Sequence, residues 1–353
     1  MPPRPTLTPR CRCTGIGSVP FTDAAEACTM LMETVDFPFW PQLPRLSFRE
    51  QMIPQYAEGL PGIVIDDANR RVRFHLGPDG HEAILAFYEK FLSGDLAPFG
   101  LSERCAAGFP AFSRLAASRR WDAVKGQITG PLTFALGVPD AGGRPAYHNF
   151  ELLDVIQKSL ARKAQWQIDR LRAFADTVII FIDEPILSAF GTSAYLNIGK
   201  DDVVRSLNEV IAPIHEAGGL AGVHCCGNTD WSLLTATDAD IANFDAWEYS
   251  RSVSLYPNEI RAFLDRGGML AWGIVPTSDA IPGQTTDSLR ARLFDGFRFL
   301  EEKGFDQRLL LDSCLLTPSC GAGNLSIDET RMVFRLLGEV SRRLREEFFG
   351  FLA

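Results

Sequence analysis

Short apolar runs alternate along this chain with longer stretches in which apolar residues recur at helical spacing. Segment 150–175 has the spacing of an amphipathic helix, and it leads into the apolar run 178–182, which is typical of a buried strand. Several of the helix-like stretches end in glycine, as at 218–219 and 267–268. The strands predicted from these patterns are 14–19, 123–129, 177–182, 220–224, 241–246, 269–274 and 309–313.

Repeated strand and helix units over 353 residues predict a single α/β domain of the (β/α)8 TIM-barrel type. Short polar motifs follow most of the predicted strands. A barrel would bring those strand ends together at one mouth. In segment 62–76, residues alternate in a strand-like pattern on either side of a turn-like stretch at 66–69, which predicts an early β-hairpin insertion. We expect the proline-rich residues 1–13 to form a loose N-terminal arm and residues 14–353 to form the barrel domain.

Composition and charge narrow the class of protein. The net charge of −9 argues against a nucleic-acid partner. No apolar run approaches the roughly 20 residues of a membrane span, which argues against a membrane partner. The first residues lack the apolar core of a signal peptide, so we expect a cytoplasmic enzyme whose cysteines stay reduced.

Candidate metal ligands occur in three of the short motifs that follow predicted strands. His224 and Cys226 lie in Val-His-Cys-Cys-Gly-Asn, Glu248 lies in Trp-Glu-Tyr-Ser, and Cys320 lies in Thr-Pro-Ser-Cys-Gly. One imidazole, one carboxylate and two thiolates form a donor set suited to a single Zn²⁺ ion. The alternative is that these thiols only pack in the core, because the chain has eight cysteines and buried cysteines behave as small apolar residues.

A catalytic zinc site differs from a structural one by leaving a position that substrate can occupy. A free thiol is largely protonated at neutral pH, whereas a thiol bound to zinc is deprotonated and nucleophilic. The predicted donor set therefore suits an enzyme that activates a small-molecule thiol. Thr129 ends another predicted strand and Asp183 follows a further one, so both are expected at the same mouth.

Three further short motifs support a family resemblance over nearly the whole chain. Thr-Gly-Ile-Gly-Ser-Val-Pro at 14–20, Thr-Gly-Pro-Leu-Thr at 129–133 and Asp-Glu-Pro at 183–185 resemble motifs of the superfamily of cobalamin-independent methionine synthase and uroporphyrinogen decarboxylase. The sequence is most similar to the short, single-barrel methionine synthases. The resemblance implies zinc bound by His224, Cys226, Glu248 and Cys320.

The resemblance also implies a substrate site and a reaction. Ser18 and the backbone near Gly17 would contact the carboxylate of an amino acid, Asp183 its ammonium group, and Thr129 would belong to the same site. Long methionine synthases have a second barrel that helps to bind folate, and we expect a single barrel here. The implied reaction is therefore methyl transfer from a methyl-corrinoid, free or on a corrinoid protein, to homocysteine, which gives methionine.

Three alternatives stay open at this point. The first is the same chemistry on another thiol such as coenzyme M, because the His-x-Cys word also resembles corrinoid-dependent methyltransferases. The second is a porphyrinogen decarboxylase, which uses an arginine-lined cleft and no metal. The third is a protein that binds zinc or a corrinoid without turnover.

Overall fold

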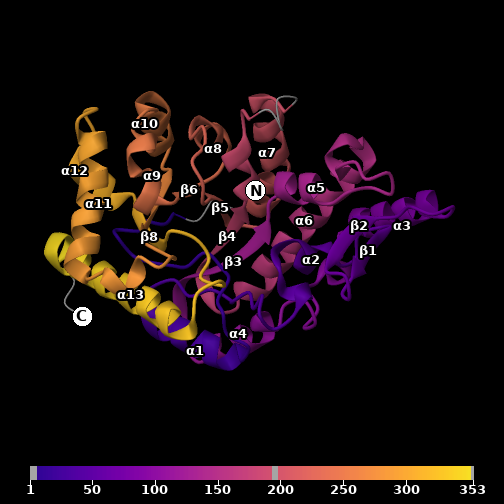
Figure 1. Ribbon diagram of the computed structural model, residues 1–353, viewed down its shortest axis with the longest axis horizontal. Coiled ribbons are helices and arrows are strands. Elements are labelled where there is room, and N and C mark those ends of the chain that lie inside the picture. Colours follow the sequence, from indigo (N-terminus) through magenta and orange to yellow (C-terminus); the bar gives the residue numbers. More distant parts are fainter. Residues whose placement is uncertain (1–5, 193–197, 351–353) are drawn as a thin grey trace.

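A six-stranded parallel sheet forms the centre of the protein. The computed structural model describes residues 6–192 and 198–350. The strands of the sheet follow one another in chain order from β3 to β8, so each connection crosses back over the outside of the sheet (Figure 1). Their bounds are Trp121–Thr129 (β3), Ala175–Asp183 (β4), Leu220–Cys225 (β5), Ile241–Phe244 (β6), Met269–Val275 (β7) and Cys314–Pro318 (β8).

Two segments without regular strand structure, 13–18 and 37–42, lie between β8 and β3 and are called the bridged segments below. Single parallel bridges join Cys13 to Leu316, Ser18 to Gln42, and Phe39 to Lys125. Prolines punctuate this part of the chain at positions 20, 38, 41 and 44, and a proline cannot donate to a strand ladder. The structure therefore has a curled six-stranded half-barrel with two bridged segments, and segment 14–19 is not the regular strand that the sequence predicts.

The inside of the curl is filled by one apolar cluster. Phe181, Ile179 and Ala271 belong to it, together with inward residues of the other strands. Ile16 and Phe37, which come from the two bridged segments, are members of the same cluster. These two segments therefore contribute to the same interior as the six strands.

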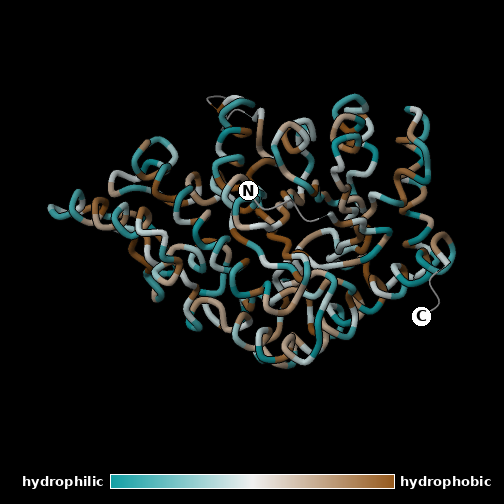
Figure 2. The backbone as a smooth tube through the Cα atoms, turned by 180° about the vertical axis from the view of Figure 1, so that it is seen from behind, coloured by the Kyte–Doolittle hydropathy of each residue, from teal (hydrophilic) through white to brown (hydrophobic). Residues whose placement is uncertain are grey.

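Helices pack around the outside of the sheet, where a second and larger apolar cluster lies. Figure 2 shows hydrophobic backbone segments gathered at the centre and hydrophilic segments on the outer turns. The helices are Ala24–Thr34 (α1), Met52–Ala57 (α2), Gly80–Leu92 (α3), Gly108–Ala116 (α4), Pro131–Gly137 (α5), Phe150–Leu171 (α6), Lys200–Glu216 (α7), Ser232–Ala236 (α8), Ala246–Val253 (α9), Pro257–Asp265 (α10), Thr286–Glu301 (α11), Gln307–Asp312 (α12) and Ile327–Phe349 (α13).

The sequence prediction is correct for β3 to β5 and β7, ends two residues late for β6, and is wrong for the last strand. Segment 309–313 falls mostly within helix α12, because Asp306 caps that helix by accepting hydrogen bonds from Arg308 N and Leu309 N. The strand begins only at Cys314. A short apolar run alone does not distinguish a strand from a buried helical turn.

The predicted hairpin is present as the antiparallel pair Ile63–Asp66 (β1) and Arg71–Phe74 (β2). With α3 it extends to one side of the sheet in Figure 1. Phe74 is buried, and its amide donates to Pro139 O at 2.9 Å, which fastens the hairpin to the segment after α5.

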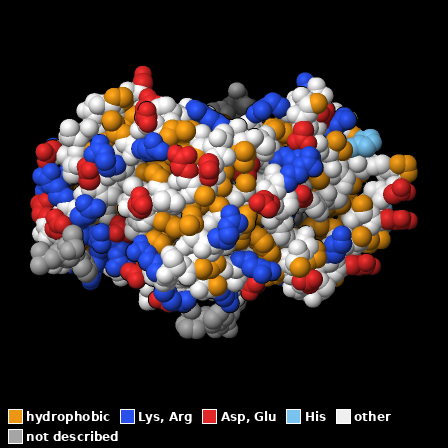
Figure 3. Space-filling view, turned by 90° about the horizontal axis from the view of Figure 1, so that it is seen from below, with side chains coloured by type: hydrophobic (Ala, Val, Ile, Leu, Met, Phe, Trp, Pro, Cys, Tyr) orange, Lys and Arg blue, Asp and Glu red, His pale blue; other side chains and the backbone are white. Residues whose placement is uncertain are grey.

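The ends and surface of the chain bear on the other predictions. The described part of the predicted N-terminal arm contacts β8, since Cys11 N donates to Cys314 O at 2.8 Å and Cys11 is buried. Figure 3 shows a face on which acidic and basic side chains are interspersed with hydrophobic ones. Within residues 6–192 and 198–350, no helix has the length and apolar character needed to cross a membrane.

Candidate metal centre and active site

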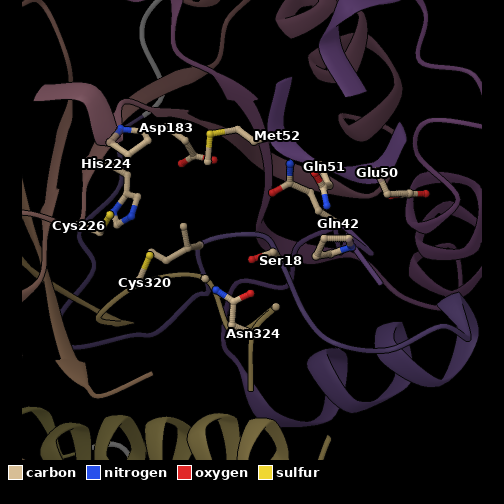
Figure 4. A pocket seen from close by; sticks show the side chains of 15 residues that line it. Ser18, Gln42, Glu50, Gln51, Met52, Asp183, His224, Cys226, Cys320 and Asn324 are labelled. Atoms are coloured by element: carbon tan, nitrogen blue, oxygen red, sulfur yellow. The ribbon is translucent and has the colours of Figure 1, made fainter. Parts of the chain in front are cut away.

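Three of the predicted metal ligands lie together at the carboxyl ends of the strands. His224 is near the end of β5, Cys226 follows that strand, and Cys320 lies two residues after β8. One ligand atom from each residue falls within 4.8 Å of the others. Figure 4 shows the three side chains on one side of a common cavity. Parallel strands thus bring together residues almost a hundred positions apart.

The His224 ring is held in one orientation by Asn243 on the neighbouring strand β6. His224 Nδ1 lies 2.5 Å from Asn243 Oδ1. The Asn243 amide nitrogen donates to Ala271 O and to Thr317 Oγ1, each at 2.9 Å, so its oxygen is the atom left to accept. Nδ1 therefore carries the proton. Nε2 is buried without a hydrogen-bond partner in the described part of the chain, and it is the nitrogen available to a metal.

The two thiols of the group differ in their electrostatic state. Cys320 and then His224, whose ligand atoms lie within 4.8 Å of the Cys226 sulfur, lower the pKa of Cys226 to about 4. The same contact with Cys226, together with burial, raises the pKa of Cys320. The pair therefore holds one thiolate that the neighbouring thiol stabilises, which is a preformed anionic site for a cation. Cys225 points elsewhere: it is fully buried, and burial raises its pKa to about 12.

The structure does not bring Glu248 into this group. The strand β6 ends at Phe244, and Asp245 caps helix α9 by accepting a hydrogen bond from Glu248 N at 3.0 Å. This cap places Glu248 in the first turn of the helix, where it is exposed. Asp245 is the buried carboxylate at this strand end, and burial raises its pKa to about 6. Glu248 as a fourth ligand stays a prediction.

Asp183 lies beside the metal-ligand group at the end of β4. Its side chain is buried, and its Oδ1 has no hydrogen-bond partner among the described residues. Burial raises the pKa of Asp183 to about 6, although His224 and the buried Lys125 act in the opposite direction. Burial in turn lowers the pKa of Lys125 to about 7. Asp183 is therefore a carboxylate that a cationic group of a ligand would satisfy.

One cavity of about 310 Å³ joins these residues. Asp183, His224 and Cys226 lie on one side of it, and Ser18 lies across from His224, beside the segment that carries Cys320 (Figure 4). Other residues around it were not identified from the sequence, because no motif contains them: Gln42, Glu50, Gln51, Met52 and Asn324.

Glycines let the walls of this cavity approach closely. A Cβ atom on Gly321 would lie 2.2 Å from Ser18 Oγ, and one on Gly17 would lie 2.5 Å from Gln42 Oε1. Gly17 also accepts a backbone hydrogen bond from Gln42 N at 3.0 Å. The predicted substrate residues Gly17 and Ser18 therefore belong to this wall, with the Ser18 hydroxyl at the cavity surface.

Thr129 and Glu184 hold the wall together rather than face the cavity. Thr129 Oγ1 donates to Met52 O at 2.5 Å. The buried Glu184 carboxylate accepts hydrogen bonds from Leu132 N at 2.8 Å and from Thr133 N and Oγ1 at 2.8 and 2.6 Å. These hydrogen bonds join the Thr-Gly-Pro-Leu-Thr motif to the Asp-Glu-Pro motif. This contact fixes the turn that presents Asp183.

Comparison with known proteins supports the fold. No protein-family model matches the chain, and no curated protein matches it in sequence. A B12-independent methionine synthase from Shewanella sp. W3-18-1, solved with selenomethionine, has a TM-score of 0.56 at 15% identity, over 97% of this chain and 99% of that one. A structure from Listeria monocytogenes, titled as a putative vitamin-B12-independent methionine synthase, has a TM-score of 0.55 at 13% identity, over 96% and 98%. The chain shares the fold of these proteins, as its motifs predict.

Proposed function

We propose that this protein is a zinc-dependent methyltransferase that methylates the thiol of homocysteine and forms methionine. The observation that carries the proposal is the open group of His224, Cys226 and Cys320 on a cavity that Asp183 also lines, with no hydrogen-bond partner for Asp183 Oδ1 among the described residues. Under this proposal the two bridged segments act as the first two strands of an eight-stranded barrel.

The donor set fits zinc in type and arrangement. One imidazole nitrogen and two thiolates match the ligands of catalytic zinc sites, and a further position is left for a substrate. Zinc, when bound, would lower the pKa of a thiol ligand enough to make it a nucleophile at neutral pH. The reducing cytoplasm, where we place the protein, keeps Cys226 and Cys320 available as thiols.

The residues of the chain then bind and orient the acceptor. Asp183 would accept hydrogen bonds from the ammonium group of homocysteine, and Ser18 would donate to its carboxylate. Asn243 keeps the proton of His224 on Nδ1, so that Nε2 stays free to bind the ion. In the reaction a carbon–sulfur bond forms, the bond between the methyl carbon and the donor breaks, and its electron pair stays with the donor. The thiol proton goes to solvent.

The cavity favours this acceptor over the alternatives. Coenzyme M carries a sulfonate and no ammonium group, so it would leave Asp183 without a cationic partner. A porphyrinogen has many carboxylates, but no arginine or lysine is among the described residues around this cavity. The selenomethionine in the Shewanella structure is a relative of the proposed product.

We propose a methyl-corrinoid as the donor, either free methylcobalamin or a corrinoid protein. The two structural neighbours are named for independence from vitamin B12, so a methyl-folate is the donor to test beside it. The donor question is separate from the acceptor chemistry, because the metal-ligand group acts on the thiol.

The test combines metal content with product formation in the same preparation. We expect one zinc per chain and methionine from homocysteine with one of the two donors. Cys226→Ser should lose both, whereas Cys225→Ala, which removes the adjacent thiol outside the group, should keep both. Zinc without methylation of homocysteine or coenzyme M would favour a non-catalytic protein, and absence of zinc from the purified wild type would refute the metal centre.

A further inference from the structure

A second cavity, of about 700 Å³, adjoins the first. Gln51 and Met52 line both cavities, so a single wall separates the metal-ligand group from this groove. The groove runs between the β1–β2 hairpin and the segment that follows α5, where Pro139 fastens Phe74. A molecule in the groove would therefore lie next to the site of methyl transfer.

Three arginines of the hairpin give the groove a positive charge. Arg70, Arg71 and Arg73 line it, and none of them forms an ion pair within the described ranges. The neighbouring Arg49 and Arg104 differ, because both pair with Asp67, at 2.8 and 3.2 Å. Three cations in one place contrast with the net charge of −9 of the whole chain.

The acidic groups near the groove are already engaged. Asp140 is the carboxylate that lines it, and it accepts hydrogen bonds from Gly142 N and Arg144 N at 2.8 and 3.0 Å. Asp66, which interacts electrostatically with Arg73, accepts hydrogen bonds from Asn69 at 3.0 and 2.8 Å. The arginines therefore outnumber the carboxylate in the groove and keep donors for an anion.

The remaining surface of the groove is apolar. Phe48, Met52, Ile53 and Val72 line it, and the Arg70 guanidinium lies 5.3 Å from the centre of the Phe48 ring. A guanidinium held over an aromatic face keeps its edge free to bind a phosphate or carboxylate in two places. The groove thus combines a flat apolar wall with a cationic rim.

From this juxtaposition we propose that the groove binds the methyl donor, with the arginines on an anionic tail and the apolar wall against the rest of the molecule. This inference rests on the proposed function and adds the place where the donor binds and the groups that recognise it. A phosphate-bearing nucleotide of a corrinoid and the glutamyl carboxylates of a methyl-folate share this chemistry.

The experiment measures binding of both donors to the full chain. The ligands are methylcobalamin and 5-methyltetrahydrofolate triglutamate, each beside a form with fewer anionic groups, methylcobinamide and the monoglutamate. The triple variant Arg70→Gln, Arg71→Gln, Arg73→Gln should bind one of the two anionic donors at least about tenfold more weakly, since charged hydrogen bonds are lost. The form with fewer anionic groups should be affected less, and the affected pair identifies the donor.

A matched control is Arg298→Gln, because Arg298 is exposed and lies on α11 outside the groove. It should bind both donors as the wild type does. Repeating the titrations in Cys226→Ser separates this inference from the proposed function, since the groove should still bind its donor when the metal group is lost. Equal binding of both anionic donors to the triple variant and the wild type would overturn the inference, as would no binding of either to the wild type.

Discussion

Asn243 gives the sharpest test of the metal centre, because it touches a predicted ligand without being one. Its oxygen accepts from His224 Nδ1, and its amide nitrogen is held by Ala271 O and Thr317 Oγ1. In Asn243→Ala the ring loses the group that fixes its tautomer and orientation. Loss of such a partner typically lowers metal affinity about 10- to 100-fold, or about 1.4 to 2.7 kcal/mol.

The same substitution also has a cost in stability. It removes the hydrogen bonds of Asn243 to His224 Nδ1, Ala271 O and Thr317 Oγ1, and each buried group left without a partner costs about 1 to 3 kcal/mol. Asn243→Asp separates the two effects, because a carboxylate still accepts from Nδ1 but cannot donate to Ala271 O. We therefore expect Asn243→Asp to be destabilised and yet to bind zinc at least as tightly as the wild type.

Competition with a chromophoric chelator at fixed pH measures the zinc affinity, and circular dichroism checks that each variant is folded. The expected order of affinity is Asn243→Asp at or above the wild type, with Asn243→Ala at least tenfold below it. Thr317→Val removes only one anchor of Asn243 and should stay within about threefold of the wild type. A folded Asn243→Ala protein with wild-type zinc affinity would refute the proposed orientation of His224.

Three other predictions concern single side chains around the cavity. Burial raises the pKa of Glu50 to about 7, so the folded chain keeps a proton that the unfolded chain releases near its ordinary pKa of 4.5. The free energy of unfolding should therefore fall by up to about 3 kcal/mol as pH rises from 5 to 8. Chemical denaturation should show a shallower fall in Glu50→Gln, and an equal fall in the two proteins would contradict the prediction. Gly321→Ala should raise the KM for the thiol about tenfold at unchanged zinc content, because the new Cβ would lie 2.2 Å from Ser18 Oγ; an unchanged KM would show that the Ser18 hydroxyl is not at the thiol site. Cys320→Ala should lose zinc, and zinc kept at the wild-type level would contradict the metal centre. Glu248→Ala tests the predicted fourth ligand: loss of zinc would show that α9 rearranges to supply it, and wild-type zinc content would show that the prediction of Glu248 is wrong.

Much of the fold could be predicted from the chain, because the strands of a parallel sheet are continuous apolar runs. Segments 123–129, 177–182, 220–224 and 269–274 lie within the bounds of β3, β4, β5 and β7. The last strand was misplaced because Leu309, Leu310 and Leu311 are as apolar as the strand beside them. The Asp306 cap, a single side chain, decides that they are helical.

The candidate site could be predicted where its residues follow strands and not elsewhere. His224, Cys226, Cys320 and Asp183 all lie at strand ends, and the fold brings those ends together. Asn243 is inside a strand, where an asparagine gives no signal until the neighbouring strand is known. Glu248 follows a strand that the sequence predicts to end at 246, whereas β6 ends at Phe244 and the cap at Asp245 begins a helix there.

The residues around the groove show a further limit of sequence patterns. Arg70, Arg71 and Arg73 belong to a hairpin that the alternation predicts, yet their importance depends on what packs opposite the hairpin. The segment after α5 supplies that opposite wall, and it is remote in sequence. Contacts between an insertion and the main domain are therefore the part of the site that only the structure supplies.

The two sides of the cavity differ in how firmly the backbone holds them. His224, Asp183 and Asn243 are on strands paired over several residues, whereas Ser18 and Gln42 are joined to each other by a single bridge. Backbone amides of the paired strands should exchange with deuterium only when a large part of the sheet opens. Amides near Ser18 and Gln42 should exchange through small local openings. The metal side of the cavity can then keep a fixed geometry while the opposite side adjusts to successive occupants, the acceptor before the reaction and its bulkier methylated product afterwards.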